Sequence, residues 1–388
     1  MMKRARRGLA ATLMIGLLAI GCAPIAPESA GDDDAQTEGS DSSVFASAVD
    51  AAFEGSGVPG GAAVITGSDT EHMLQHAFGE AAEGREVALQ TPFAYRSMTK
   101  SFVGTVILQL VDEGRLSIDD TVGQYIDGVP SGDEITIEQL GAMRSGVANY
   151  SGSPKLTDLL VVDPARDPGV QELLELAYPE SPEFAPGTAF EYSNTNTLLL
   201  GQVIEAVTGN PWFEEVDARV LQPLGLDSVT DGLNDVEGDA VGYQLAGGSV
   251  EEQVPWVAPG WFGAAGALAG DVEDLATWGR ALGDGTLLET ETQQWRLERF
   301  GPTSDDARSP EYDGYGFAMG EIDGWVGHTG TGLGFQGLVM HDVESGRTVA
   351  MLVNGTGEDP DLPAHVFAEL LPTIESLRTF ADAGGSDE

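Results

Sequence analysis

The chain has 388 residues, of which 41% are hydrophobic, and its 63 acidic residues outnumber its 18 basic residues, giving a net charge of −45. This length and hydrophobic content allow one large or two ordinary domains with a real core. The charge disfavours nucleic acid and anionic lipid headgroups as partners, because both are also negatively charged. A disulfide framework is excluded because Cys22 is the single cysteine.

The first 22 residues have the pattern of a signal peptide. Four basic side chains within the first seven positions precede a 12-residue apolar run, Leu9–Ile20, which is too short to span a bilayer. The ending at Cys22 resembles a bacterial lipoprotein signal in which that cysteine is lipidated, although Ala19 departs from the usual residue at its position. A plain signal peptide with an incidental cysteine stays open. We expect an exported protein, either secreted or held at the extracytoplasmic membrane face only by an N-terminal lipid anchor.

Residues 23–43 are rich in Pro, Gly, Ser and Asp without apolar periodicity, which predicts a disordered acidic tether. One folded domain is expected over residues 44–380, followed by a flexible tail over residues 381–388. The domain opens with a predicted helix, Val44–Phe53, and two predicted strands, Gly61–Ile65 and His72–Phe78. His72 and His76 would be spaced as a metal pair only in a helix, so no metal is expected there.

The stretch around Ser97 has the most specific chemical pattern in the chain. Apolar residues at helical spacing predict a helix over Phe102–Val111, with Ser97 in its first turn. Lys100 follows Ser97 by three positions, so both side chains share one helix face. A serine hydroxyl becomes a nucleophile when a base takes its proton, and a lysine is such a base if burial lowers its pKa. Taken alone, the pair could also be an N-cap serine beside a surface lysine.

The remaining elements predict the fold class. Turns rich in Pro, Gly and Asp separate short helical runs over about residues 116–261, which predicts a mostly helical lobe. Helices are then predicted over Asp271–Leu282 and Leu362–Phe380, the latter interrupted near Pro372. Four strands are predicted between them: Tyr315–Gly320, Gly324–Gly327, Phe335–Asp342 and Thr348–Asn354. This order predicts an α+β fold with an antiparallel β-sheet flanked by helices and a mostly helical second lobe.

Two further segments carry polar groups suited to a site. Tyr192 and Asn194 stand on a loop before a predicted helix, where a phenol can carry a proton and an amide can bind a peptide-like substrate. Farther along, the segment Gly327-His328-Thr329-Gly330-Thr331-Gly332 would present an imidazole and a hydroxyl between glycines that permit close approach of a ligand. Each segment alone could be an ordinary turn.

Together, Ser-x-x-Lys, Tyr-x-Asn and His-Thr-Gly occur in the order that marks the penicillin-recognising serine hydrolases. Over roughly residues 45–377 the chain resembles the β-lactamase/DD-peptidase family, and most closely the class C-like branch with D-alanyl-D-alanine carboxypeptidases that carry His-Thr-Gly. The resemblance implies that Ser97 is the acylated nucleophile, Lys100 its activating partner and Tyr192 a proton relay to the leaving group. Whether Lys100 or Tyr192 is the general base stays open.

The resemblance also implies how substrate is bound. Asn194 would bind the substrate amide, and the backbone N–H groups of Ser97 and Thr331 would form the oxyanion hole. The substrate carboxylate would meet the strand that carries His328, Thr329, Gly330 and Thr331. No cofactor or metal is implied. Because His328 replaces a commoner lysine, carboxylate binding should weaken as pH rises through the imidazole pKa. Arg96 and Arg144 also depart from the family pattern.

The implied activity is that of an exported serine hydrolase working through an acyl-enzyme on Ser97. A D-alanyl-D-alanine carboxypeptidase-like activity on a peptidoglycan peptide, or a related amide or ester hydrolysis of a small molecule, is the leading expectation. A β-lactamase or esterase would use the same machinery. A non-catalytic cell-wall-binding or penicillin-sensing lipoprotein is the alternative from another class. β-Lactams are further candidate ligands, and a monomer is expected.

Overall fold

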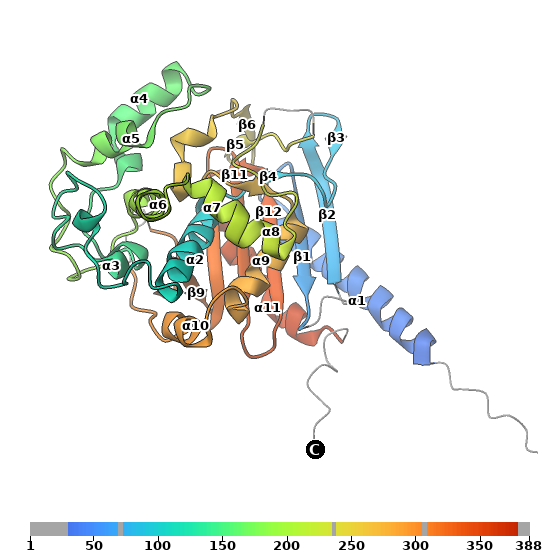
Figure 1. Cartoon of the computed structure of the whole chain (residues 1–388). Coiled ribbons are helices and arrows are strands. Elements are labelled where there is room, and N and C mark those ends of the chain that lie inside the picture. The colour runs from blue at the N-terminus through green and yellow to red at the C-terminus, as the bar shows by residue number, and fades with distance from the viewer. Residues whose placement is uncertain (1–29, 69–72, 235–237, 305–308, 379–388) are drawn as a thin grey trace, which may run out of the picture.

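An eight-stranded antiparallel β-sheet forms the centre of the molecule (Figure 1). The computed structural model describes residues 30–68, 73–234, 238–304 and 309–378, and of residues 30–38 only the backbone. The strand order across the sheet is β3 (Arg85–Glu86), β2 (Met73–Ala82), β1 (Gly60–Thr66), β12 (Thr348–Val353), β11 (Phe335–His341), β10 (Trp325–Gly332), β9 (Gly320–Ile322) and β8 (Gly314–Tyr315). The predicted α+β fold with an antiparallel sheet is therefore confirmed.

Alternate residues of the central strands enter two separate cores, as expected when both faces of a sheet are covered. In β1, for example, Val64 belongs to one core and Ile65 to the other. Helices α2 (Thr99–Asp112) and α9 (Val272–Asp284) contribute to the first core, and helices α1 (Ala30–Phe53) and α11 (Leu362–Ser376) contribute to the second. Gly279 of α9 lies so close to the sheet that an added Cβ would be 2.2 Å from a methyl carbon of Val339.

A mostly helical lobe lies beside the sheet, on the left in Figure 1. Its helices are α3 (Ile137–Gly141), α4 (Pro154–Val162), α5 (Val170–Ala177), α6 (Asn194–Thr208), α7 (Trp212–Val216) and α8 (Gln222–Leu224), with a π-helical turn, η4 (Asp217–Leu221), between the last two. Short 3-10 turns, η2 (Val122–Gln124) and η3 (Tyr150–Gly152), connect the earlier helices.

Several short elements complete the chain. Strands β5 (Tyr243–Ala246) and β6 (Ser249–Gln253) form a hairpin, and β5 pairs in parallel with β13 (Gly355–Thr356). Strand β4 (Phe93–Ala94) pairs with β7 (Ala269–Gly270) just before the Ser97 segment. The 3-10 turns η5 (Pro259–Trp261) and η6 (Gly263–Ala265) and the helix α10 (Thr290–Leu297) make up the rest.

The structure corrects four sequence-based boundaries. Helix α1 begins at Ala30, so residues 30–43 are helical rather than part of a disordered tether. The expected strand Tyr315–Gly320 is two short strands, β8 and β9, and the predicted lobe includes the β5–β6 hairpin. Helix α11 continues through Pro372. The predicted signal peptide with Cys22, residues 23–29 and the tail 381–388 lie outside the described residues.

Two negative findings concern the described residues alone. None of their helices combines the length and apolar character needed to cross a bilayer. None of their His, Cys, Asp and Glu side chains gather in threes with a geometry suited to a metal ion. His76 instead lies 2.6 Å from a carboxylate oxygen of Asp50, while His72 is outside the described residues.

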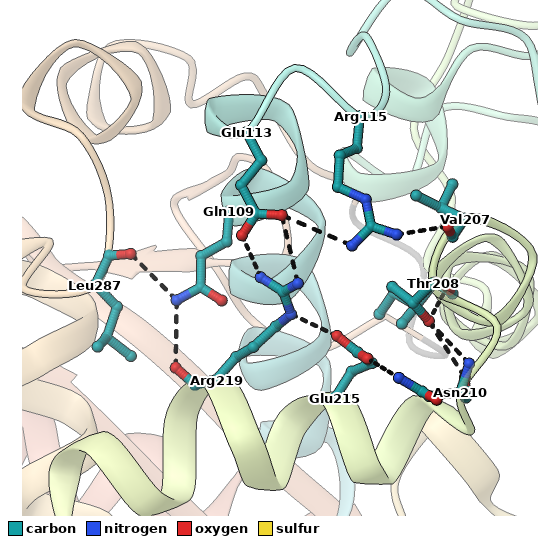
Figure 2. Close-up of polar contacts among 10 residues, drawn as sticks. Gln109, Glu113, Arg115, Val207, Thr208, Asn210, Glu215, Arg219 and Leu287 are labelled. Carbon is teal, nitrogen blue, oxygen red and sulfur yellow. Dashed lines mark hydrogen bonds and ion pairs between the residues drawn. The ribbon is translucent and has the colours of Figure 1, made fainter.

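A polar cluster joins the helical lobe to the C-terminal end of α2. Figure 2 shows the Arg219 guanidinium between the carboxylates of Glu113 and Glu215, with ion pairs to both. The side-chain amide of Gln109 donates to the carbonyls of Arg219 and Leu287, 3.3 Å and 3.2 Å away. Because Glu215 is buried, the ion pair satisfies a carboxylate that would otherwise be costly to desolvate.

Candidate active site

Ser97 lies in a 3-10 turn, η1 (Arg96–Met98), that leads directly into α2. The turn begins with a strained residue, because Arg96 has a φ of 52° although it is not glycine. Such backbone strain persists only where the surrounding structure imposes it, and it is common at functional sites. The predicted position of Ser97 at the start of a buried helix is thus observed.

Lys100 lies directly beneath Ser97. Its Nζ is 2.9 Å from Ser97 Oγ and donates to the carbonyl oxygen of Ala265 at 2.6 Å. The lysine is fully buried, and this burial holds its pKa well below the ordinary value. A neutral amine at this distance can accept the Ser97 proton, which is the chemistry that the Ser-x-x-Lys spacing predicts.

Tyr192 reaches the same point from the loop before α6. Its ring centroid lies 5.1 Å from Lys100 Nζ, and its hydroxyl makes no hydrogen bond to any described residue. Burial raises the pKa of Tyr192 well above its usual value, and Tyr312 raises it further, whereas the nearby Ser97 side chain lowers it. The phenol therefore stays protonated near neutral pH, with a hydroxyl free to donate to an incoming group.

Strand β10 brings its backbone against the nucleophile. A Cβ added to Gly330 would lie 2.2 Å from the carbonyl oxygen of Tyr95 and 3.2 Å from the Ser97 nitrogen, so only glycine fits. Thr331 follows, exposed, and its hydroxyl donates to the carbonyl of Pro360 at 2.6 Å. The close contact of β10 with the Ser97 backbone supports the predicted oxyanion hole formed by the N–H groups of Ser97 and Thr331. The oxyanion hole itself stays a prediction.

His328 differs from its predicted role. The ring is fully buried: Nδ1 donates to the Thr329 carbonyl at 2.6 Å, which leaves Nε2 to accept from the Tyr315 hydroxyl at 3.0 Å. Burial is the main cause that lowers its pKa to about 3; the Lys100 amine, when protonated, and Arg296 add to this shift, and the Thr329 carbonyl opposes it. The imidazole is therefore neutral near pH 7. The prediction that His328 provides a titratable cation for a substrate carboxylate is wrong.

The other predicted binding residues are placed as follows. Asn194 begins α6, and its Nδ2 donates to Ser151 Oγ at 2.8 Å; within the described structure it makes no hydrogen bond to Ser97 or Lys100. The Thr329 hydroxyl lies 2.8 Å from the Tyr312 hydroxyl. Arg144 donates to the Pro302 carbonyl at 2.8 Å.

Sequence reasoning missed three groups of the site. Tyr312 and Tyr315 hold His328 and Thr329 from β8 and the loop before it, and the Ala265 carbonyl holds Lys100. No spacing signal could have found the carbonyl, because any residue type supplies one. The two tyrosines could have been found only as aromatic residues near a predicted strand.

A serine beside a buried lysine and a phenol, at the start of a helix next to an antiparallel sheet, defines a serine hydrolase with a β-lactamase/transpeptidase-like fold. A family model described as Beta-lactamase matches residues 45–371. The chain belongs to this family of serine hydrolases.

Similar proteins support this assignment. A D-aminopeptidase from Brucella anthropi is 28% identical over 346 residues, which is 84% of this chain and 62% of that protein. This chain therefore spans less than two thirds of that relative. The structure of a D-stereospecific amidohydrolase from a Streptomyces species is 27% identical with a TM-score of 0.73, covering 84% of this chain and 99% of that one. A penicillin-binding protein from Bacillus halodurans is 25% identical with a TM-score of 0.70, covering 85% and 98%.

Proposed function

We propose that this protein is an amidohydrolase that forms an acyl-enzyme on Ser97 and acts on amides of D-amino acids or short peptides with a free amino group. The observation that carries the proposal is the buried Lys100 amine 2.9 Å from Ser97 Oγ, below a phenol with a free hydroxyl. The similarity to a D-aminopeptidase and to a D-stereospecific amidohydrolase supports the amide as the reacting group.

The proposed reaction gives each group a defined role. Neutral Lys100 takes the Ser97 proton as Oγ attacks the carbonyl carbon, and backbone N–H groups at Ser97 and Thr331 stabilise the oxyanion. The carbon–nitrogen bond then breaks as Tyr192 donates its proton to the leaving amine, and the proton on Lys100 returns to Tyr192. Water hydrolyses the ester to release the acid and regenerate Ser97. Tyr192 acts as the acid because its phenol is protonated near neutral pH and its hydroxyl is free to donate.

The charges around the site favour an amine-bearing substrate over one with a terminal carboxylate. A carboxypeptidase would need a cation for that carboxylate, but His328 is neutral and both of its ring nitrogens are already bonded. Asp361, in contrast, follows Pro360, whose carbonyl accepts from the Thr331 hydroxyl. The negative charge of Asp361 contributes to the raised pKa of both the Tyr192 and the Tyr312 phenols. A carboxylate in this position suits a substrate ammonium group.

A substrate panel tests the proposal on the full chain. We expect turnover of D-alanine p-nitroanilide to exceed that of the L-isomer, of acetyl-lysyl-D-alanyl-D-alanine, of a chromogenic cephalosporin and of p-nitrophenyl acetate. Ser97→Ala should abolish all turnover. Preferential release of D-alanine from the acetylated peptide would replace the proposal with a carboxypeptidase, and covalent penicillin labelling without turnover of any substrate would favour a sensor.

We further propose that residues 1–22 export the protein and that Cys22 carries a lipid. The support is the charged start, the short apolar run and the cysteine at its end. Expression in a bacterium fed radiolabelled palmitate should label the wild-type chain and leave Cys22→Ser unlabelled. A secreted, unlabelled wild-type protein would show a plain signal peptide instead.

A further inference from the structure

A pocket with a cavity volume of about 90 Å³ adjoins Arg96. Its walls are mainly apolar and aromatic and include Leu233, Val254, Trp256, Phe262, Leu333 and Phe335. Ser97, Lys100, Tyr192 and His328 do not line it. The side chains of the proposed catalytic site thus lie outside the pocket lining, whereas Arg96, the residue before the nucleophile, is part of it.

Among the described residues, Arg96 is the single basic side chain that lines this pocket, and it is only 7% exposed. Its Nε donates to the Gly332 carbonyl at 2.9 Å and its Nη2 to the Leu333 carbonyl at 3.3 Å. The guanidinium carbon lies 4.1 Å from the ring centroid of Phe262 and 5.3 Å from that of Phe335. These contacts leave Nη1 without a hydrogen-bond partner among the described residues.

No carboxylate neutralises this arginine in the described part of the chain, although acidic residues greatly outnumber basic ones. Asp239 also lines the pocket, but its Oδ2 accepts from the Asn234 backbone nitrogen at 2.9 Å. Burial lowers the pKa of Arg96 to about 9, which still leaves it charged near pH 7. A buried cation of this kind usually has an anionic partner, because an unpaired buried charge is costly.

We propose that this pocket binds a small amphipathic carboxylate, with its apolar group between Trp256, Phe262 and Phe335 and its carboxylate on Arg96 Nη1. Aromatic walls with one positioned charged group at the base are typical of small-molecule sites. Arginine is suited to the carboxylate because its planar guanidinium matches that group.

Occupancy of this second site should alter turnover at Ser97. Arg96 immediately precedes the nucleophile, and it holds the two carbonyls that follow Thr331, the predicted oxyanion donor. A carboxylate on Nη1 would attract the guanidinium toward the pocket and so weaken its hydrogen bonds to those two carbonyls. This effect rests on the proposed function: we expect bound ligand to lower kcat rather than to compete with substrate, because the contact that it alters adjoins the predicted oxyanion donor.

Isothermal titration calorimetry of the full chain tests the binding directly and does not depend on the identity of the substrate. The probe is 4-phenylbutyrate, and the matched uncharged compound is 4-phenylbutan-1-ol. We expect the acid to bind roughly tenfold or more tightly than the alcohol, as one charge-assisted hydrogen bond predicts. Arg96→Gln should remove this preference for the acid.

Trp256→Ala is the second variant, because Trp256 lies in the pocket wall and outside the proposed catalytic machinery. It should lose binding of both compounds and retain turnover, so the test does not depend on whether Arg96→Gln folds. Equal affinity of the wild-type protein for acid and alcohol, absence of binding, unchanged binding by Trp256→Ala, or competition between 4-phenylbutyrate and substrate would each overturn the proposal.

Discussion

Lys100 illustrates how burial, rather than residue type, decides the chemistry of a side chain. The only other lysine in the described structure, Lys155, is exposed on α4, whereas Lys100 is fully buried against Ser97 and Ala265. Desolvation disfavours the charged form of an amine, which lowers its pKa and favours the neutral amine that the proposed mechanism uses as a base.

We predict that Lys100→Met lowers kcat by about a thousandfold or more, because the loss of a proton acceptor next to a nucleophile has effects of this size. Lys155→Met is the matched control and should retain wild-type turnover. Steady-state kinetics on the best substrate of the panel measures both variants. A Lys100→Met enzyme with near-normal kcat would remove Lys100 from the mechanism.

His328 gives a prediction about stability and pH. Its pKa is about 3 in the folded protein, against about 6.5 in an unfolded chain. Between these two values the unfolded state binds more protons, so the free energy of unfolding should fall as pH falls, by about 1.4 kcal/mol per pH unit for one such group. Urea unfolding between pH 7 and pH 4 should show a smaller pH dependence for His328→Gln than for the wild type.

The exposed His365 provides a control of opposite sign. Asp359 and Glu311 raise its pKa, so its stabilising contribution is present at low pH and is lost as pH rises through the folded value. His365→Gln should therefore steepen the loss of stability on acidification, whereas His328→Gln should reduce it. The same direction of change in both variants would contradict the assignment of His328 as neutral.

At the scale of elements, the contact between β10 and η1 fixes the site. Gly330→Ala would force a Cβ to within 2.2 Å of the Tyr95 carbonyl oxygen, so β10 or η1 must move. We expect kcat to fall at least about tenfold, because small displacements of oxyanion donors have effects of this size. Gly152→Ala, which adds a Cβ to open space, is the control and should be neutral. Wild-type kinetics for Gly330→Ala would show that the close contact between β10 and η1 is unimportant for catalysis.

The polar cluster around Arg219 holds η4 against the end of α2. Its side chain is 21% exposed, and its partners Glu113 and Glu215 are 43% and 9% exposed. We predict that Arg219→Met destabilises the protein by about 1–3 kcal/mol, mainly because Glu215 loses its partner. Arg299→Met, at an exposed pair with an N–O distance of 3.9 Å, should cost under about 1 kcal/mol. Equal melting temperatures for the two variants would contradict this difference.

Elements with strong periodicity were predictable from sequence, and those that depend on tertiary contacts were not. The apolar spacing after Ser97 and the predicted strand Phe335–Asp342 correspond to α2 and β11. The β5–β6 hairpin was missed because β6 is exposed throughout and has no apolar alternation. In the site, motif order predicted that Ser97, Lys100 and Tyr192 would gather, but the ionisation of His328 depends on burial by Tyr312 and Tyr315, which spacing does not reveal.

At the scale of the whole molecule, the excess of acidic residues produces repulsion between like charges. The formal charge of −45 acts against the compact state, and added salt screens interactions between exposed charges. We predict that the melting temperature rises as sodium chloride is increased from 10 mM to 500 mM at pH 7. An unchanged or lower melting temperature, measured by calorimetry, would show that attractive ion pairs such as that of Arg166 with Glu172 outweigh the repulsion.

The Ala265 carbonyl that accepts from Lys100 lies 165 positions farther along the chain. In a partly folded chain that lacks this contact, the Lys100 amine is hydrated and has its ordinary pKa. It is then protonated and does not activate Ser97. The proposed reactivity of Ser97 is thus expected only when these distant parts of the chain have come together.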